Sequence, residues 1–419
     1  MTHHTENSPK LDADVIVVGG GHAGLSMTAI LGAQGLKVIC VDRETPSETL
    51  SETFDGRTTA ISFGSQKVLA EAGIWDVMAE SCCPIENIQI LDGADSPVFL
   101  EFDSSEVGGR IFGWIAENRR IRHALYKRID ALPDAKIIAP AQVTDFKVTD
   151  DTASVILADD RVFTAKLIVG ADGRGSFTRD WMGIDTRQWS YKQRAVVCIA
   201  QHENPHNNIA VEHFHAQGPF AALPMLDDEN GNHRSSVVWT EHCDEKDSSR
   251  HYSEELFNMA LTDHFPDFYG KVKVVGGRYA FPLGLVHAHN YIAPRMALVA
   301  DAAHGIHPIA GQGLNLGFRD IAALCELIAQ AADKGADIGS DELLQSYQRQ
   351  RRFDNMAMAG ATDVLNKLFS NDITPVRIAR KAGMRAISKL PFAKQFFMKQ
   401  AMGGTGILPA MIKDGQEAA

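Results

Sequence analysis

Three features are scarce in this sequence: long apolar runs, cysteine and an excess of positive charge. No stretch approaches the roughly 18–20 consecutive apolar residues that a membrane span needs, and the polar segment from Met1 to Pro9 resembles neither a signal peptide nor an anchor. The 53 acidic side chains outnumber the 41 basic ones, and the resulting net charge of −12 disfavours nonspecific binding to nucleic acid. With 45% hydrophobic and 22% charged residues, the 419-residue chain is expected to be a cytoplasmic globular protein of two or three domains.

The thiols and histidines lack the spacings that disulfide or metal chemistry requires. No Cys-x-x-Cys pair occurs among the six cysteines, and adjacent Cys82 and Cys83 are interpreted as ordinary thiols in preference to a redox pair. His304 and His307 are one residue short of the i, i+4 spacing that places two imidazoles on one metal. The sequence therefore predicts neither a disulfide framework nor a metal site.

A glycine motif provides the first positive signal. Gly19-x-Gly21-x-x-Gly24 directly follows a run of β-branched residues and opens a helical stretch. A second strand pattern ends on Asp42, 18 residues after Gly24, where a carboxylate can accept hydrogen bonds from ribose hydroxyls. Glycines at these positions allow a tight turn, close approach of the backbone to a pyrophosphate, and close packing of helix on strand. A dinucleotide site is favoured over a bare structural turn, and spacing alone leaves both FAD and NAD open.

The strand patterns indicate that one domain interrupts another. Residues 191–282 alternate apolar and polar side chains in short runs, with a helical insert near 253–265, which predicts an antiparallel sheet. The pattern of a buried parallel strand returns at 296–300, and the final part of the chain is mainly helical. The expected fold class is α/β: a Rossmann-type nucleotide-binding domain with an inserted, mainly antiparallel β-sheet domain and a helical C-terminal region.

Three blocks, in order along nearly the whole chain, resemble the para-hydroxybenzoate hydroxylase-like flavoprotein monooxygenases. They are the glycine motif with its acid, the motif Gly170-Ala-Asp172-Gly173-Arg174, and the segment from Asp301 to Asp320 that contains His304-Gly-Ile-His307-Pro308 and Gly311-Gln312-Gly313-Leu314-Asn315. The resemblance implies tightly held FAD and NAD(P)H as a transient electron donor. The implied FAD-binding residues are Gly19, Gly21, Gly24, Asp42, Arg43, Arg57, Arg120, Asp172, Asp301, Gly311, Gln312, Gly313, Leu314 and Asn315.

The same resemblance implies a division of the chain. FAD-binding parts are expected at 10–82, 105–186 and 284–340, substrate-domain strands at 83–104, the substrate domain at 187–283, and a C-terminal helical region at 341–419. The family pattern is broken at Ala300, where the family usually has glycine; alanine fits there if its φ is negative.

A narrower resemblance is to the ubiquinone-biosynthesis FAD-dependent hydroxylases, which are polyprenylphenol monooxygenases. It is carried by Asp55-Gly-Arg57-Thr-Thr-Ala-Ile-Ser62, by Gln193-Arg-Ala-Val-Val, by Gly218-Pro219-Phe-Ala-Ala-Leu-Pro224, and by His307-Pro308 with Gly311-Gln312-Gly313. It implies hydroxylation of the aromatic ring of a polyprenylated phenol by O2 through a flavin hydroperoxide. No catalytic side chain is required, and the implied pocket residues are His307, Pro308, Phe220 and Pro224.

Several alternatives stay open at this level. His213 and His215 share one strand face, which either lines the substrate cavity or faces solvent. The segment from Val376 to Met402 carries seven cations and no acid, so it is either a peripheral contact with an anionic inner membrane or acidic partner, or a packing helix with a solvated basic face. Rival functions are another flavin oxidoreductase on this scaffold, such as a reductase or a hydroxylase of a different aromatic, and a non-catalytic prenyl-lipid carrier. The ring carbon, the choice of NADH or NADPH, the oligomeric state and contacts with other ubiquinone-biosynthesis proteins are not readable from the sequence.

Overall fold

The structure is a computed structural model that describes residues 11–51, 56–93, 100–215, 217–307, 311–369, 375, 383, 387, 390–404 and 408–413. A six-stranded sheet lies at the centre of the nucleotide-binding domain, in the order β18-β19-β12-β1-β2-β8. Its strands are β1 (Val15–Val18), β2 (Val38–Val41), β8 (Ala135–Ile138), β12 (Leu167–Gly170), β18 (Ile292–Ala293) and β19 (Met296–Leu298). All neighbouring strands are parallel except β18. The predicted βαβ unit is therefore present.

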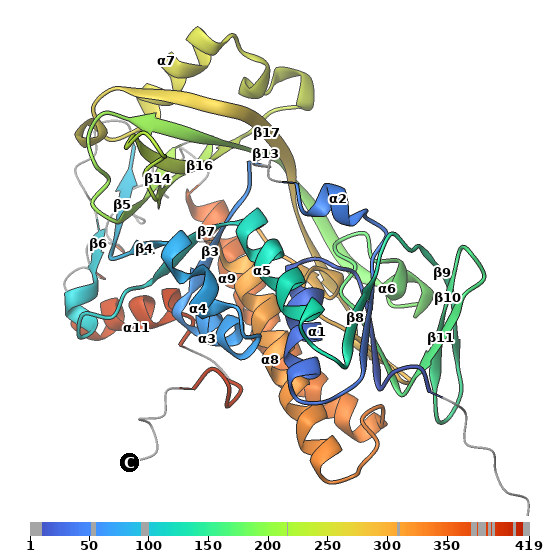
Figure 1. Cartoon of the computed structure of the whole chain (residues 1–419). Coiled ribbons are helices and arrows are strands. Elements are labelled where there is room, and N and C mark those ends of the chain that lie inside the picture. Colours follow the sequence, from blue (N-terminus) through green and yellow to red (C-terminus); the bar gives the residue numbers. More distant parts are fainter. Residues whose placement is uncertain are drawn as a thin grey trace, which may run out of the picture.

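The two faces of this sheet are covered differently, which explains why its strands read as continuous apolar runs. Side chains such as Val15 and Val17 pack against the helices α1 (His22–Ala33), α5 (Asn118–Asp130) and α8 (Gln312–Asp333). The alternate side chains, such as Ile16 and Val18, pack against a three-stranded antiparallel sheet. Figure 1 shows this small sheet beside the six-stranded one. That small sheet consists of β9 (Val143–Val148), β10 (Ala153–Leu157) and β11 (Val162–Ala165).

The second domain is built on an eight-stranded sheet with the order β20-β17-β13-β16-β15-β14-β5-β6. Its strands are β5 (Asn87–Asp92), β6 (Leu100–Asp103), β13 (Thr186–His202), β14 (Ile209–His215), β15 (Gly218–Met225), β16 (His233–Glu241), β17 (Val272–Ala288) and β20 (His304–Gly305). Only the pair β14 and β5 is parallel. One face is covered by α7 (Glu254–His264), whose Phe257 and Leu261 are buried in it.

A smaller sheet and several short helices connect the two domains. The sheet consists of β3 (Thr58–Ser62), β7 (Gly113–Glu117) and β4 (Cys83–Ile85). Within the stretch 83–104, β5 and β6 join the eight-stranded sheet, whereas β4 pairs with β7. The short helices are α2 (Pro46–Thr49), α3 (Phe63–Glu71), α4 (Trp75–Met78) and α6 (Phe177–Trp181), with 3-10 turns η1 (Ala79–Ser81), η2 (Ser104–Val107), η3 (Glu245–Asp247), η4 (Ser249–His251) and η5 (Asp267–Tyr269).

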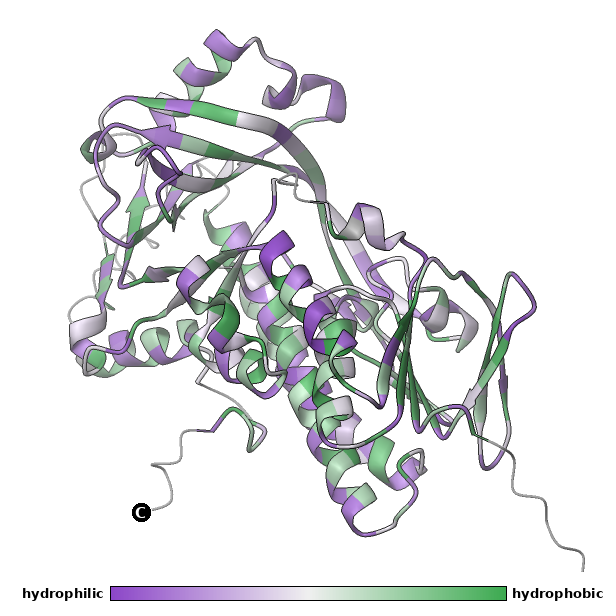
Figure 2. Cartoon of the chain, viewed as in Figure 1, coloured by the Kyte–Doolittle hydropathy of each residue, from purple (hydrophilic) through white to green (hydrophobic). Residues whose placement is uncertain are grey.

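The described residues of the C-terminal part include the helices α9 and α11 besides α8. The long helix α9 (Asp341–Phe369) packs against α8, and α11 (Pro391–Ala401) contacts η2. Much of the basic segment from Val376 to Met402 lies outside the described residues; within it, Lys394 pairs with Glu106 and Lys399 is exposed. Figure 2 shows hydrophobic and hydrophilic residues side by side along α11. In the part of the chain that the structure describes, no helix combines the length and the hydropathy of a membrane span.

Candidate active site

The glycine turn between β1 and α1 has the geometry that a dinucleotide needs. Gly19 has φ +110°, and a Cβ there would lie 2.4 Å from the carbonyl oxygen of Ala171. A Cβ on Gly24 would lie 1.9 Å from the carbonyl oxygen of Gly19, so helix and turn can pack only without it. A Cβ on Gly21 would meet nothing within 4 Å, and no side chain caps the first N–H groups of α1 there. Packing requires glycine at positions 19 and 24. Gly21, in contrast, leaves an open approach to the backbone at the start of α1, which fits a pyrophosphate.

Asp42 follows β2 and helps to hold this turn. One carboxylate oxygen accepts a hydrogen bond from the amide of Gly20, and the other accepts one from the amide of Glu44 at 2.6 Å. Because each carboxylate oxygen has two lone pairs, acceptor capacity remains for a ribose hydroxyl. Arg43, the next residue, is exposed.

The other two predicted arginines, Arg57 and Arg120, have different surroundings. The guanidinium of Arg57 stacks over the ring of Phe281, 4.6 Å from its centroid. Arg120 is exposed near the start of α5 and lines a charged pocket of about 390 Å³ together with Arg119 and Arg234. The start of the same helix touches α1, where His22 Nε2 lies 3.1 Å from the carbonyl oxygen of Asn118.

Asp172 belongs to the loop after β12, and its carboxylate is used by that loop. It accepts hydrogen bonds from the Ser176 hydroxyl at 2.5 Å and from both the amide and the hydroxyl of Thr178 at 2.9 Å. A Cβ on the next residue, Gly173, would meet nothing within 4 Å, and Gly173 has φ +81°. The side chain of Asp172 thus shapes the loop, and the open side of the loop is backbone.

Asp301 lies in the 3-10 turn η6 (Ala300–Ala302) after β19. Its carboxylate is 45% exposed and accepts a hydrogen bond from the Arg174 Nε at 3.3 Å, so it is available to a ligand hydroxyl. The expectation of a negative φ at Ala300 is wrong, because φ is +52°. The conformation is compatible with alanine only at a cost of about 1–2 kcal/mol, and a Cβ on Gly317 would lie 2.7 Å from the Ala300 Cβ. Alanine at position 300 therefore requires glycine at 317.

The segment 311–315 begins α8 and is tied to β3. Gly311 is the N-cap of α8 with φ +61°, and its position makes no side-chain cap hydrogen bond. The Asn315 side chain accepts a hydrogen bond from the Ser62 amide at 3.1 Å and donates to the carbonyls of Ala60 and Gly311, both at 3.0 Å. Gln312 is buried, and Gly313 is open on its Cβ side. A rigid helix start, with the positive end of its dipole at this segment, fits the edge of an isoalloxazine ring.

A cavity of about 1000 Å³ adjoins this helix start. It is bounded by Gln312 and Asn315, by one face of the eight-stranded sheet, by β3, by α9 and by α11. Most of its lining is aliphatic or aromatic, as Ile90, Phe102 and Phe214 illustrate. Its size is at the upper end of the roughly 300–1,000 Å³ that is usual for ligand pockets. An aromatic ring with a long apolar substituent is a fitting occupant.

Two predicted pocket residues, Phe220 and Pro224, lie on the face of β15 that does not line the cavity. Along β15 the cavity is lined by Pro219, Ala221 and Leu223, and alternation turns Phe220 and Pro224 to the other face. The ring of Phe220 packs there against Phe265 with centroids 5.3 Å apart. Because residues on both faces of β15 are buried and apolar, hydrophobicity alone does not show which face meets the cavity.

The two histidines of β14 also point away from the cavity, contrary to both expected alternatives. The His213 ring contacts the carbonyls of Gly93 and His264 at 2.9 and 3.1 Å, and the His215 ring lies 4.6 Å from the ring of His264 on α7. The residues on either side of His213 that face the cavity are Glu212 and Phe214.

His307 lines the cavity and is fully buried, with its ring 5.1 Å from the Tyr191 ring in an edge-to-face arrangement. Burial, reinforced by the positive charge of Arg174, lowers the pKa of His307 to about 4. It is therefore a neutral imidazole at physiological pH. Pro308, the other predicted pocket residue here, lies outside the described residues.

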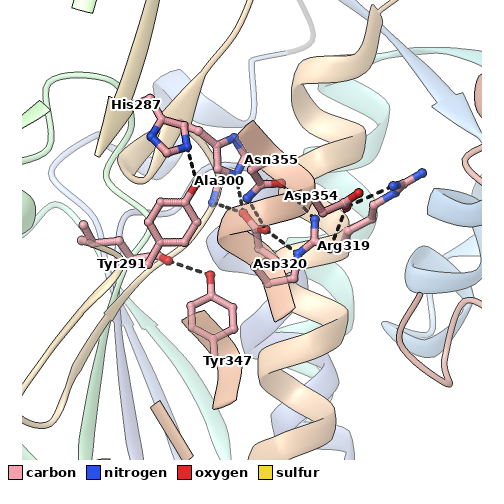
Figure 3. Close-up of polar contacts among 11 residues, drawn as sticks. His287, Tyr291, Ala300, Arg319, Asp320, Tyr347, Asp354 and Asn355 are labelled. Atoms are coloured by element: carbon pink, nitrogen blue, oxygen red, sulfur yellow. Dashed lines mark hydrogen bonds and ion pairs between the residues drawn. The ribbon is translucent and has the colours of Figure 1, made fainter. Parts of the chain in front are cut away.

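A buried polar network holds η6 against α8 and α9 (Figure 3). The Asp320 carboxylate accepts hydrogen bonds from the Ala300 amide at 3.0 Å, His304 Nε2 at 2.5 Å, Arg351 Nε at 2.9 Å and Asn355 Nδ2 at 3.0 Å. Asp320 and Arg351 are both completely buried. Burial alone would raise the pKa of Asp320, but His304 and Arg351 outweigh it and lower the pKa to about 2.

The network extends from Arg351 to the surface of α9. Asp354 accepts from Arg351 at 2.8 Å and from Arg319 at 3.2 Å, and it also lines the cavity. Sequence reasoning missed this network, although Arg351 and Asn355, four residues apart, share one face of α9. Since Asp320 bonds directly to the amide of Ala300, the network fixes the residue that precedes Asp301.

Comparisons with known proteins agree with this geometry. The model of the family described as FAD binding domain matches residues 12–361. The chain is 42% identical over 391 residues to the ubiquinone hydroxylase UbiL of Rhodospirillum rubrum, covering 93% of this chain and 90% of that protein. It is 31% identical to the 3-demethoxyubiquinol 3-hydroxylase of Escherichia coli, covering 93% and 98%. Among solved structures, the p-nitrophenol 4-monooxygenase PnpA of Pseudomonas putida has a TM-score of 0.78 at 18% identity, covering 94% and 99%, which shows a shared fold.

Proposed function

The chain belongs to the FAD-binding domain family, and on this premise we propose that it hydroxylates the aromatic ring of a polyprenylated phenol in ubiquinone biosynthesis. It is a flavoprotein hydroxylase that uses FAD, O2 and an NAD(P)H electron donor. The observation that carries the substrate assignment is the cavity, which is bounded at once by the start of α8 and by Phe396 and Phe397 of α11. A lipid-tailed phenol needs such a cavity, because its ring must reach the flavin while its chain stays among apolar side chains.

Each block of the site has a part in holding FAD. The turn around Gly21 would bind the pyrophosphate, Asp42 the ribose, Asp301 the ribityl chain, and the start of α8 the isoalloxazine ring. When bound, FAD takes electrons from NAD(P)H and transfers one oxygen atom of O2 to the ring. The protein supplies orientation and the exclusion of water.

Other residues of the site hold these FAD-binding parts in position relative to one another. Asn315 fixes the start of α8 to β3 through two hydrogen bonds and to Gly311 through a third, and Asp320 fixes the turn that carries Asp301. His307, held neutral by burial, adds no charge to the cavity beside the ring. The apolar walls keep bulk water from the place where oxygen is activated.

The experiment that tests this function is the quinone profile of a strain from which the gene has been deleted. The expected result is loss of ubiquinone and accumulation of a prenylated phenol that lacks one ring hydroxyl, whose structure identifies the carbon. Wild-type protein should restore ubiquinone, whereas Asp301→Ala should not, because that variant should retain little FAD. Unchanged ubiquinone in the deletion strain would contradict the substrate assignment. A purified protein without flavin would instead favour the prenyl-lipid carrier.

We also propose that α11 contacts an anionic membrane surface, from which the substrate enters the cavity. Phe396 and Phe397 both line the cavity and are 57% and 39% exposed, and Phe392 on the same helix is 73% exposed. Exposed aromatic rings beside lysines are typical of helices that lie in a membrane interface.

Vesicle sedimentation tests this contact. Wild-type protein should bind phosphatidylcholine vesicles that contain phosphatidylglycerol more tightly than vesicles of phosphatidylcholine alone. Replacing Phe392 and Phe396 by serine should weaken binding roughly tenfold, since two inserted rings are lost. Val77→Ser is the matched control, because Val77 is 69% exposed on α4. Equal binding by the double variant and the control would contradict the proposal.

A further inference from the structure

Glu212 is a carboxylate in an otherwise largely apolar cavity. It lies in the middle of β14, opposite Ala221 of β15 and Ile90 of β5, and it lines the cavity together with both of these residues. Alternation along β14 turns its neighbours His213 and His215 to the face covered by α7. Glu212 is thus the charged residue among the β14 side chains that line the cavity, beside Ala210, Val211 and Phe214.

The Glu212 carboxylate has no hydrogen-bond or ion-pair partner within the described residues. Glu241, a buried glutamate on β16 of the same sheet, provides a contrast: its carboxylate accepts from the Ser248 hydroxyl at 2.9 Å and from the Ser249 amide at 3.1 Å. A structural glutamate in this sheet is therefore satisfied by the protein. Glu212 is left for a donor that the described part of the chain does not supply.

The surroundings of Glu212 leave few other groups that titrate. β5, β15 and β16 contribute to the cavity only apolar side chains and Thr240, and β3 contributes Thr58 and Ser62 besides apolar groups. The other titratable or charged lining residues in the described part of the chain are His307 and Asp354. Asp354 is ion-paired with Arg319 and Arg351, and burial lowers the pKa of His307 to about 4. Burial in turn raises the pKa of Glu212 to about 7, so a transition near neutral pH belongs to Glu212.

We propose that Glu212 accepts the hydrogen bond of the phenol hydroxyl on the substrate ring and takes its proton as the ring is oxidised. This inference rests on the proposed function, which provides a phenol and an oxygen donor. An unpartnered carboxylate in apolar surroundings is costly, and such groups concentrate at functional sites. A phenol O–H is the complementary donor, and a ring with an ionised oxygen is more electron-rich than a neutral phenol.

The proposed step is balanced. The O–H bond of the phenol breaks, its proton passes to a Glu212 oxygen, and the electron pair moves into the ring. The ring carbon then forms its C–O bond with one oxygen atom derived from O2. The displaced ring hydrogen leaves as a proton, and the ring becomes aromatic again. The second oxygen atom leaves as water, with both electrons from NAD(P)H, so the overall change is Ar–H + O2 + NAD(P)H + H⁺ to Ar–OH + H2O + NAD(P)⁺.

The test uses the FAD-loaded protein in four forms: wild type, Glu212→Gln, Glu212→Asp and Glu255→Gln. The last is the matched control, since Glu255 is an exposed residue of α7. The probe is a phenol with a short isoprenyl chain, compared with its O-methyl ether, which has the same shape and no hydroxyl proton. FAD absorbance checks that each variant is loaded.

Binding is the readout that does not depend on turnover. The wild type and Glu255→Gln should bind the phenol about tenfold more tightly than the ether, because only the phenol has a hydroxyl group that can donate a hydrogen bond to the Glu212 carboxylate. In Glu212→Gln this preference should fall to about twofold or less, while ether binding stays unchanged. A preference that survives in Glu212→Gln would overturn the proposal.

Turnover supplies the second readout. In the wild type kcat/KM should rise with pH around a midpoint near 7. Glu212→Gln should lower kcat by about 10²–10⁴-fold and abolish that midpoint, and Glu212→Asp should retain it. Hydroxylation by all four forms alike would overturn the role of Glu212. If the wild type and Glu255→Gln bind FAD but oxidise no prenylated phenol, the proposed function fails instead, and the binding preference still decides whether Glu212 meets a phenol.

Discussion

Asp320→Asn probes the buried network that supports the flavin-binding turn. The substitution keeps the size of the side chain and removes the charge that faces Arg351 and His304, both of which are almost completely buried. The amide nitrogen of asparagine is a donor, so it meets at least one of the four donors that now surround the carboxylate. Breaking a buried ion pair in this way costs about 3–5 kcal/mol.

The lowered pKa of Asp320 supports an effect of this size. A shift from 3.8 to about 2 corresponds to about 2 kcal/mol of stability. Because the pKa is lowered in the folded state, this contribution is complete above pH 3.8 and is lost as the pH falls towards 2. The difference in free energy of unfolding between wild type and Asp320→Asn should therefore be largest at pH 7 and should become smaller as the pH falls from 3.8 towards 2.

Urea denaturation followed by circular dichroism measures the loss, and FAD absorbance after gel filtration measures cofactor retention. Asp333→Asn is the matched control, because Asp333 is the exposed last residue of α8; it should change stability by about 0.5 kcal/mol or less. Adding Arg351→Met to Asp320→Asn should recover part of the loss, since the unpaired charge disappears. A loss below about 1 kcal/mol for Asp320→Asn, with full FAD retention, would refute the reasoning that this pair supports the site.

Contacts around the site support four further predictions. Ala300→Gly should raise stability by about 0.5 kcal/mol in thermal unfolding, because glycine adopts φ +52° without strain. Gly317→Ala should cost about 1–3 kcal/mol, and less in the Ala300→Gly background, because its 2.7 Å contact with the Ala300 Cβ is then absent; equal costs in both backgrounds would contradict the packing argument. Glu212→Gln should be more stable than wild type by about 1–2 kcal/mol at pH 8 and equal to it at pH 4.5, because a pKa raised from 4.5 to about 7 makes the wild type lose stability as pH rises through 7. Asn315→Ala should lose about 2–4 kcal/mol and most of its FAD, because three buried hydrogen bonds to β3 and the start of α8 disappear.

The local parts of the fold were readable from the sequence because their signals are short in range. The β-branched run before Gly19 and the strand that ends on Asp42 predicted a βαβ unit, and the structure contains it as β1, α1 and β2. The antiparallel second domain was likewise indicated by alternation over 191–282, where β13 to β17 are found. In each case the pattern and the contacts that it predicts lie within one element or between close neighbours.

The sequence did not show in the same way which face of β14 and of β15 lines the cavity. Every residue of β15 except Leu223 is buried, so Phe220 and Pro219 look equally suitable for a pocket. Glu212 was overlooked because a glutamate on a strand usually faces solvent. Only the pairing of β14 with β5 and β15 decides which of these side chains meet the cavity.

The network around Asp320 was hidden by sequence distance. Asp320 contacts residues 16, 20, 31 and 35 positions away, on η6, β20 and α9, and no local pattern links these positions. The backbone of Ala300 was hidden for another reason. A positive φ at alanine is uncommon. It is stabilised here by the hydrogen bond that the Ala300 amide donates to Asp320, and by the space that the missing side chain of Gly317 leaves.

The most direct test of the central claim is oxygen labelling. Purified FAD-loaded protein is given NAD(P)H, a prenylated phenol and ¹⁸O2, and the product is examined by mass spectrometry. The account predicts one labelled oxygen atom bound to a ring carbon of the phenol. An unlabelled or unchanged phenol, with O2 released only as hydrogen peroxide, would contradict it.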